Sequence, residues 1–516
     1  MKGLTESGKQ KACGAAFLLI GIGFLITRLF RLDCLPLGLH VDEAGMAYDA
    51  WSLANYGVDR WLKSWPVYLD NYGAGQSSLY AFICAVLFKC FGYNIWLVRL
   101  PVVVFSALTL IFGVKLSRRI FSDDIFSAVL TAGLITFCPY MVMQSRFGLD
   151  CNLMLGASTV FLYFFVTALE TGRTWRYVVG GIAGGIMLYT YALSYIILPL
   201  FLLLSLLYLL VVKGLSFKKW VCMACPMAVL ALPLILVQIV NLFDLEEFTI
   251  GFFTITNIKY YRASSIGRFN LSYFITALKS VFIGDNYLYE SIPGICNLYA
   301  LTIPLFLAGI ADAFAGLVKS LKKKEISFIA FPLFWFLAVL FFEAHIKPCT
   351  YTMNSIFCAV ILLSVGGVYA IKKHAGRVYP LIAAAICLIY AVCALRFTGF
   401  YFFKYTDATF KLAYFGCTFA EAVDVIENND VLKNKRTFVS EVGIYYALSS
   451  KISPYDFDLA GDECIEWNNY WFGSLQEISD DCNYIVCGRF EEYCDELRSA
   501  GFIEEKYDNY SLFYKE

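Results

Sequence analysis

Two acidic sites, each next to an apolar segment, are the residues of this chain best suited to chemistry. Asp42 and Glu43 follow the apolar run 14–30, and Asp150 closes the sequence Arg146-Phe147-Gly148-Leu149-Asp150 after a second apolar segment. Ionisable residues at a membrane boundary are usually functional. A partly desolvated carboxylate can act as a general base, and a guanidinium can balance the charge of a phosphate. The pattern therefore indicates a site built from carboxylates and an arginine.

Each of these residues also has a structural interpretation. Asp42 is a good N-cap for the helix that follows, and Gly148 with Asp150 fits a turn and an N-cap for a helix starting near residue 153. The Arg146 side chain can extend to lipid headgroups. Asp42 and Glu43 are adjacent, so they point in different directions, and only one of them should share a cavity with Asp150. Spacing alone does not separate these interpretations.

The composition places the chain among integral membrane proteins. Of its 516 residues, 59% are hydrophobic and 16% are charged, and its mean hydropathy is +0.64. These values lie far from those of soluble domains. The formal net charge is zero, so nothing suggests nucleic acid as a partner. We expect a polytopic α-helical membrane protein in contact with the lipid bilayer.

Eleven apolar runs have the length of a membrane span. They cover residues 14–30, 98–114, 124–141, 153–170, 177–194, 196–212, 220–242, 298–318, 326–342, 351–371 and 378–396. The first run ends at Arg28 and Arg31 without a small-residue cleavage site, which indicates a retained signal anchor. A twelfth run, 77–91, is shorter and carries Lys89.

The basic clusters decide the orientation. If 77–91 lies at the membrane surface or re-enters, the clusters near residues 117, 215, 322 and 373 fall on the same side as the N-terminal lysines, which is then the cytoplasm. Asp42, Asp150, the loop 243–297 and everything after 397 then lie outside. We therefore predict a multi-pass plasma-membrane protein with eleven helices and an extracytoplasmic active site.

The outer regions have recognisable elements. Residues 44–55 suit an interfacial helix that ends at Asn55-Tyr56-Gly57 through a left-handed cap. The loop 243–297 is basic and aromatic, as expected of a lid. We divide the chain into a membrane domain, 1–399, and an extracytoplasmic α/β domain, 400–516. The latter is predicted from strands at 437–442 and 483–487 and helices at 414–428 and 491–500. Four of its cysteines lie close enough in sequence to form disulfides, and the sequence leaves their pairing open: Cys464, Cys482, Cys487 and Cys494.

Several motifs in the first 240 residues occur together. Asp42-Glu43 is followed by the interfacial helix, an aromatic segment at Ser77–Tyr80, a turn at Phe91-Gly92-Tyr93-Asn94, and Val98-Arg99-Leu100-Pro101 at the opening of the second span. This set resembles the GT-C membrane glycosyltransferases. Within them it is similar to the bacterial relatives of dolichyl-phosphate-mannose protein mannosyltransferases and of the lipid A aminoarabinose transferase. The arginine and aspartate of their second outer loop match Arg146 and Asp150.

The resemblance implies transfer of a sugar from a polyprenyl-phosphate donor to an extracytoplasmic acceptor, which can be a protein, a lipid or a cell-envelope glycan. Single displacement would invert the anomeric configuration. The aminoarabinose transferases carry Glu-Lys-Pro before the aromatic segment, where this chain has Ala74-Gly75-Gln76. The donor and acceptor of this chain can therefore differ from theirs.

On this interpretation Asp42 is the base, and Glu43 or Asp150 orients the acceptor hydroxyl. The remaining expected site residues form two groups. The donor phosphate is assigned to Arg146, Arg99, Arg262, Arg268 and Lys259, and substrate binding to His40, Tyr72, Gln76 and Tyr80.

No cofactor is required by this chemistry, although two carboxylates beside His40 leave a divalent cation open. A transporter or flippase for lipid-linked substrates is the alternative from another class. A structural or sensory membrane protein is a third.

Overall fold

The computed structural model contains two compact units, and it describes residues 6–71, 74–258, 266–284, 291–405, 415–416, 419–456, 466–473, 477–507 and 509–516. Unit 1 combines residues 1–30, 100–235 and 262–401, and unit 2 combines residues 31–99, 236–261 and 402–516. Both units are therefore discontinuous in sequence, and the last crossing between them falls between Tyr401 and Phe402.

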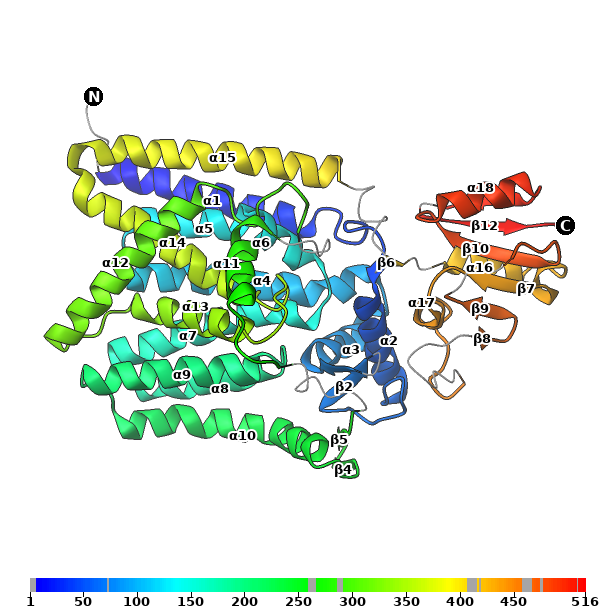
Figure 1. Ribbon diagram of the computed structural model, residues 1–516, viewed down its shortest axis with the longest axis horizontal. Coiled ribbons are helices and arrows are strands. Elements are labelled where there is room, and N and C mark those ends of the chain that lie inside the picture. Colours follow the sequence, from blue (N-terminus) through cyan, green and yellow to red (C-terminus); the bar gives the residue numbers. More distant parts are fainter. Residues whose placement is uncertain are drawn as a thin grey trace. The chain divides into compact units, whose positions relative to one another are not determined.

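Unit 1 is a bundle in which most helix axes are roughly aligned, while α11 lies across them (Figure 1). Its helices, including three (α4, α10 and α15) that cross into unit 2, are α1 (Glu6–Leu29), α4 (Ile95–Ile120), α5 (Ile125–Phe137), α6 (Pro139–Met143), α7 (Leu153–Thr171), α8 (Thr174–Leu188), α9 (Ser194–Val211), α10 (Phe217–Leu242), α11 (Leu271–Ile283), α12 (Thr302–Lys323), α13 (Ala330–Glu343), α14 (Ile356–Ala375) and α15 (Tyr379–Phe403). Short 3-10 turns lie at Gln144–Arg146, Asp150–Asn152 and Gly376–Val378.

Six of the helical segments in the described residues are long and apolar enough to cross a membrane, or seven if the bent pair α5–α6 counts as one span. The part of α1 at Cys13–Leu29, together with α3 (Leu79–Phe91), α11 and α13, counts among the shorter apolar helices. Each of the eleven ranges expected from the sequence overlaps a helix of the bundle. The multi-helix membrane fold is therefore confirmed, at the level of six or seven candidate spans.

Close contact between α12 and α14 depends on two glycines. A Cβ atom on Gly309 would lie 1.7 Å from the carbonyl oxygen of Leu363, and one on Gly367 would lie 2.0 Å from that of Leu305. Small residues at a helix interface allow the backbones to approach in this way. Alanine at either position would force these two helices apart.

The first part of unit 2 is the segment after α1. It contains β1 (Leu39–His40), α2 (Val41–Tyr56), a hairpin of β2 (Tyr68–Asn71) and β3 (Ala74–Ser77), and α3. The α2 helix ends at Gly57, whose φ of 77° is left-handed, so the predicted cap is confirmed. The helix starts earlier than expected and includes Asp42 and Glu43 in its first turn.

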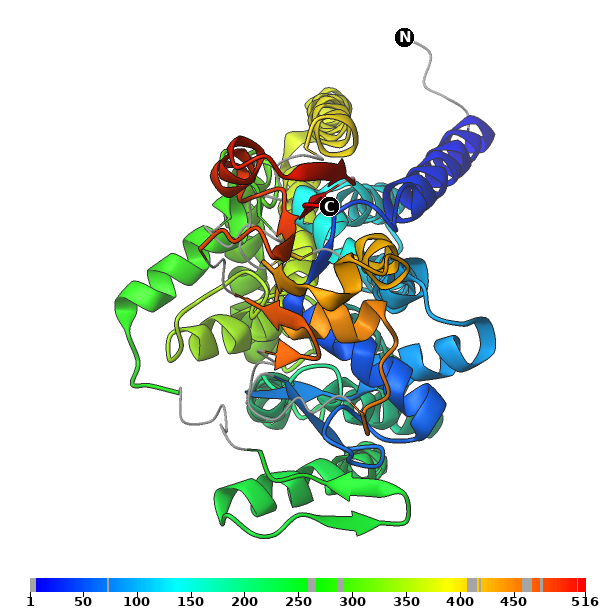
Figure 2. The ribbon, with the colours of Figure 1, turned by 90° about the vertical axis from the view of Figure 1, so that its right-hand side faces the viewer.

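The loop 243–297 contains regular elements. A second hairpin joins β4 (Phe248–Ile250) to β5 (Phe253–Ile255), the two green arrows in Figure 2. The hairpin packs on the first part of unit 2 through the bond from Val67 N to Thr254 O, at 2.9 Å.

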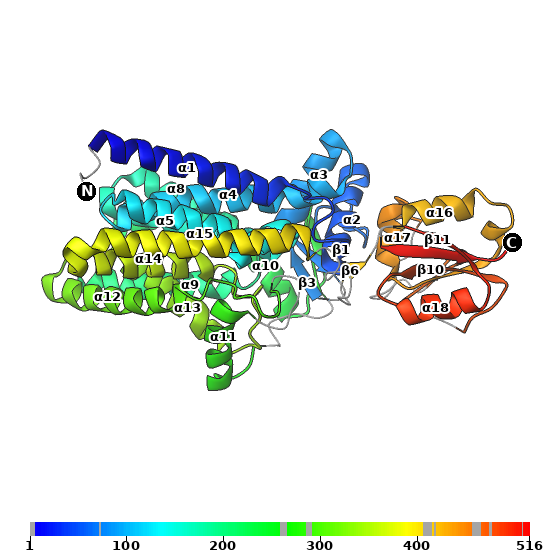
Figure 3. The ribbon, with the colours of Figure 1, turned by 90° about the horizontal axis from the view of Figure 1, so that it is seen from above.

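The tail of unit 2 is a mixed α/β layer structure. Its six strands have the order β11 (Ile503–Lys506), β12 (Tyr510–Tyr514), β10 (Cys482–Cys487), β7 (Arg436–Val439), β9 (Tyr470–Phe472) and β8 (Glu466–Trp467). The central strands β10, β7 and β9 are parallel. Figure 3 shows α16 (Ala420–Glu427) and α18 (Glu491–Ser499) on opposite faces of the sheet. A 3-10 turn (Leu432–Asn434) precedes β7, and α17 (Gly443–Ser449) follows it.

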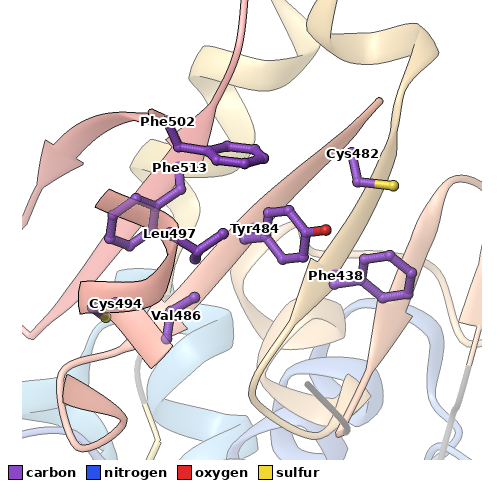
Figure 4. Packing of buried hydrophobic residues seen from close by; sticks show 8 residues of the cluster. All are labelled: Phe438, Cys482, Tyr484, Val486, Cys494, Leu497, Phe502 and Phe513. Atoms are coloured by element: carbon purple, nitrogen blue, oxygen red, sulfur yellow. The ribbon is translucent and has the colours of Figure 1, made fainter. Parts of the chain in front are cut away.

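One face of this sheet packs on α18 around Tyr484, with Phe438, Val486, Leu497 and Phe513 buried beside it (Figure 4). Cys482, Cys487 and Cys494 are free thiols, so no disulfide joins these three, while Cys464 lies outside the described residues. The strand predicted at 437–442 ends at Val439, and the helix predicted at 414–428 begins only at Ala420.

Candidate functional site

The α2 helix begins with a capping box. The Nδ1 atom of His40 accepts a bond from the Asp42 backbone N–H at 3.1 Å, and Glu43 Oε2 accepts one from the His40 N–H at 3.2 Å. His40, and not Asp42, is therefore the N-cap. The N-cap interpretation of Asp42 is wrong because the preceding imidazole already satisfies the first-turn N–H.

Asp42 is left with an accessible carboxylate. Its side chain is 40% exposed, and its Oδ1 accepts a bond from Asn71 Nδ2 in β2 at 2.9 Å. The His40 ring lies 3.7 Å from Oδ2, but burial lowers the pKa of His40 despite the nearby carboxylates of Asp42 and Glu43. His40 is thus neutral near pH 7, and Asn71 is the hydrogen-bond donor that fixes the orientation of the carboxylate.

Glu43 points the other way, into the interior of unit 2. Its carboxylate pairs with Arg99 at the start of α4, with Nε–Oε1 at 2.9 Å and Nη2–Oε2 at 3.3 Å. Both side chains are fully buried. Arg99 also donates to the carbonyls of Leu32, Pro36 and Gly38, so all five guanidinium N–H groups are used. The pair anchors α2 and the loop before it to α4.

A second buried pair lies further along α2. Asp49 binds Arg60 through Oδ1–Nε at 2.9 Å and Oδ2–Nη2 at 2.7 Å. The neighbouring Asp59 accepts the backbone N–H groups of Trp61 and Lys63, each at 2.9 Å. Burial raises the pKa of Asp59 to about 7, and the Asp49 carboxylate adds to the shift. No spacing in the sequence marks these residues as partners, so this cluster was not predicted.

Arg146 lies in unit 1 and is fully buried. It donates to the carbonyls of Thr27 and Arg28 at 3.0 Å and of Phe30 at 2.8 Å, which are the last carbonyls of α1 and its extension. These carbonyls lack helical partners. The interpretation of Arg146 as a headgroup contact is wrong, because its guanidinium points inward; its assignment to the donor phosphate stays a prediction.

Asp150 opens the 3-10 turn before α7 and is 8% exposed. Its Oδ1 accepts the N–H of Cys151 at 2.8 Å. The N-cap of α7 is Asn152, which makes no capping bond with its side chain, so the N-cap interpretation of Asp150 is wrong. Asp150 belongs to unit 1 and Asp42 to unit 2, and their shared cavity stays a prediction.

The other expected site residues have varied surroundings. Gln76 lies in β3, buried, with an Oε1 atom that has no partner among the described residues. Tyr80 is buried and donates to the Val98 carbonyl at 2.8 Å. Arg268 is exposed in unit 1. Tyr72, Lys259 and Arg262 lie outside the described residues.

Within the described ranges, no group of three or more His, Cys, Asp or Glu side chains is arranged to hold a metal ion. The residues beside His40 instead form the capping box and the bond to Asn71.

Comparisons with known proteins agree with the resemblance found in the sequence. Residues 76–241 match the family described as dolichyl-phosphate-mannose-protein mannosyltransferase. A search among curated proteins finds no significant match. The crystal structure of ArnT from Cupriavidus metallidurans bound to undecaprenyl phosphate has a TM-score of 0.54 at 12% identity, covering 99% of this chain and 98% of that one. The apo form of the same protein has a TM-score of 0.52 at 13% identity, covering 98% of both chains.

These comparisons confirm the resemblance. The family match includes the start of α4 with Val98-Arg99-Leu100-Pro101, and the similarity of fold extends over both units. Asp42 and Glu43 lie before the matched segment, so their roles rest on the geometry described above.

Proposed function

We propose that this chain is a GT-C membrane glycosyltransferase, with its family segment at residues 76–241. It moves a sugar from a polyprenyl-phosphate donor to an extracytoplasmic acceptor. The solved structure of similar fold was determined with undecaprenyl phosphate, which supports a polyprenyl carrier for the donor. Transfer proceeds by single displacement and inverts the anomeric carbon.

Asp42 is the general base of this proposal, and its geometry is the observation that carries it. The carboxylate is accessible, while the helix beneath it is fixed by the capping box and by the buried Glu43–Arg99 pair. A base must be held in a defined position to accept the proton of the attacking hydroxyl. The bond from Asn71 supplies that orientation.

The donor phosphate needs a cationic partner that the substrate can reach. Arg99 and Arg146 are fully buried and donate to groups of the protein, so they suit the role less than their residue type suggested. The exposed Arg268, with Lys259 and Arg262 of the same loop, takes their place. Asp150 remains a candidate to orient the acceptor, whereas Glu43, fully buried and paired with Arg99, suits that role less than its residue type suggested.

The proposed reaction does not require a metal. The leaving group is a lipid phosphate that is already ionised, so it departs without a Lewis acid. We therefore expect a chelator to leave the transfer rate unchanged.

The proposed topology has eleven spans with α3 at the membrane surface. The N-terminus and the basic clusters lie in the cytoplasm, and Asp42 and the tail lie outside the plasma membrane.

A test on membranes separates transfer from transport. Membranes that contain the protein receive a polyprenyl-phosphate sugar labelled in both the lipid and the sugar. A transferase releases free lipid phosphate in step with labelled acceptor or free sugar. A flippase moves the intact donor between leaflets and leaves the bond between sugar and phosphate unbroken, which would overturn the proposal.

A further inference from the structure

A cavity of about 460 Å³ lies within unit 2, between the loop that follows α1 and the tail. Its loop side includes Asp33 and Leu37–Leu39, and its tail side includes Glu421, Lys506, Tyr507 and Tyr510. We refer to it as the loop–tail cavity. Its size falls in the range of about 300–1,000 Å³ that small-molecule sites occupy.

The two walls of the cavity are fixed to each other. Strand β1 pairs with β6 (Phe415–Gly416), with Leu39 opposite Gly416. Tyr445 of α17 accepts the Gly416 N–H at 3.0 Å and donates to the Leu39 carbonyl at 2.9 Å. Tyr48 of α2 donates to the Ile452 carbonyl at 2.9 Å. The cavity is therefore built by specific contacts of both walls.

The tail wall carries a fixed aromatic surface. Tyr507 and Tyr510 stack with ring centroids 4.7 Å apart and planes at 16°. Tyr510 is buried, and its hydroxyl donates to Glu421 Oε2 at 2.6 Å, so this hydrogen bond holds the Tyr510 ring in place. The half-buried Tyr507 ring stacks on the Tyr510 ring. Rigid aromatic rings contribute a large contact area at a small cost in conformational entropy.

The charges of the cavity restrict its ligand. Asp33 and Glu421 are acidic and Lys506 is basic, so the lining carries one net negative charge at neutral pH. Phosphates and acidic sugars are repelled by such a lining. Carboxylates, an ammonium group and the amide of Asn509 can bond hydroxyl groups. The chemistry that fits is an uncharged, hydroxyl-rich ring whose apolar face lies on Tyr507.

The cavity also lies close to the proposed base. Leu39 lines it and precedes Asp42 by three residues, so the two Cα atoms are at most about 11 Å apart. A chain of sugar units can therefore place one ring in the cavity while its terminal hydroxyl reaches Asp42.

We propose that the loop–tail cavity binds an uncharged sugar unit of a glycan acceptor. This inference rests on the proposed function and names the acceptor class: a neutral glycan whose distal unit is held by the tail and whose terminal hydroxyl is glycosylated.

The test measures oligosaccharide binding to the full-length protein in lipid nanodiscs. The probes are fluorescently labelled neutral di- and trisaccharides of glucose, galactose, mannose and N-acetylglucosamine, and a disaccharide that contains glucuronic acid. We expect at least one neutral probe to saturate, and the acidic probe to bind at least about tenfold more weakly. Tyr507→Ala should weaken the neutral probe by about tenfold or more, and Tyr507→Phe by less than about twofold, because phenylalanine keeps the ring.

Two further variants complete the design. Tyr455→Ala removes an exposed tyrosine of the tail outside the cavity and should bind like the parent. Asp33→Lys changes an exposed residue, so we expect folding to be preserved. The substitution reverses the net charge of the lining and should bring the affinity for the acidic probe to within about threefold of that for the neutral probe.

The inference is overturned if no neutral probe saturates, if Tyr507→Ala and Tyr455→Ala bind alike, or if Asp33→Lys leaves the preference unchanged. Release of lipid phosphate from the labelled donor is measured on the same samples. Normal release without oligosaccharide binding would overturn the cavity and keep the transferase. Oligosaccharide binding without release of lipid phosphate would keep the cavity as a sugar-binding site and overturn the transferase.

Discussion

Four carboxylates lie on α2 or just after it, and their exposure distinguishes them. The side chain of Asp42 is 40% exposed, whereas Glu43, Asp49 and Asp59 are fully buried. Two of the buried groups are paired with arginines, and the third accepts two backbone N–H groups. An acceptor hydroxyl can reach only the exposed carboxylate, which favours Asp42 as the base. The buried acids fix the helix.

Asp59 should make stability depend on pH. Its folded pKa of about 7 lies above the unfolded value, so the folded state holds a proton that the unfolded state has lost. Stability is then greatest below the unfolded pKa of about 4 and falls as the pH rises toward 7. An asparagine at this position would keep the acceptor oxygen without ionising. We expect Asp59→Asn to flatten the fall of the melting temperature between pH 5 and pH 8, with a gain of at most about 4 kcal/mol at pH 8.

The matched control for this measurement is Asp424→Asn, at an exposed position of α16, which should leave the pH profile of the melting temperature as in the parent. A parent protein whose melting temperature rises from pH 5 to pH 8, with the variant following it, would contradict the assignment.

The sequence predicted some of these residues but not how they are used. Asp42 and Asp150 stand out in the sequence as carboxylates at the ends of apolar runs. Both N-cap interpretations are wrong, because a neighbouring residue is the N-cap in each case: His40 for α2 and Asn152 for α7. An imidazole as the N-cap is an uncommon choice, so His40 was not anticipated in that role. Arg60 and Asp59 lack any local signal, because their burial depends on how the chain after α2 folds back on the helix.

At the scale of elements, two arginines hold the ends of helices in unit 1. Arg28 on α1 donates to the carbonyls of Ile135 at 2.9 Å and Met141 at 2.7 Å, on either side of the 63° bend between α5 and α6. Arg146, just after that bend, donates back to the end of α1. Each guanidinium thus satisfies carbonyls that a helix end leaves without partners.

Arg146 and Arg268 should separate the structural role from the phosphate role. Arg146→Ala leaves three carbonyls, two of them buried, without this donor, and we expect a loss of about 3 kcal/mol in stability, with a partial return in Arg146→Lys. Arg268→Ala removes an exposed cation and should raise the KM for the donor by about tenfold without lowering the melting temperature. Thermal melting and donor kinetics on purified protein measure both.

The opposite pattern would return the donor phosphate to Arg146. That pattern is an Arg146→Ala variant that melts like the parent but has a raised donor KM, together with an Arg268→Ala variant that binds the donor normally.

Elements that a short stretch of sequence specifies by itself were predicted correctly. The left-handed end of α2 at Gly57 and the buried strand β10 both agree with expectation. Strand β11 was missed because its sequence, Ile503-Glu504-Glu505-Lys506, is polar and its pairing with β12 supplies the missing preference. The bend between α5 and α6 follows from Pro139 at the first position of α6, yet its stabilisation by Arg28 depends on a distant helix.

At the scale of the whole molecule, membrane orientation is the property that the basic clusters predict. Fusions of green fluorescent protein at residues 118, 213 or 322 should fluoresce in the cytoplasm, and fusions of alkaline phosphatase at residues 270 or 451 should be active outside. Short apolar helices such as α3 make this an experimental question, since their length does not decide whether they cross. Active phosphatase at residues 118, 213 and 322 would place α3 across the membrane and reverse every later loop.

The proposed function depends most on the Asp42 carboxylate as the base of sugar transfer from a lipid phosphate. The decisive measurement is the rate of lipid phosphate release from labelled polyprenyl-phosphate sugar, in the presence of acceptor, for the parent protein and for Asp42→Asn reconstituted at equal amounts. Asparagine keeps the shape of the side chain but takes up no proton, so we predict that the rate falls by about 10²–10⁴ while the melting temperature stays within a few degrees. A variant that releases lipid phosphate and glycosylates the acceptor at the parent rate would contradict it.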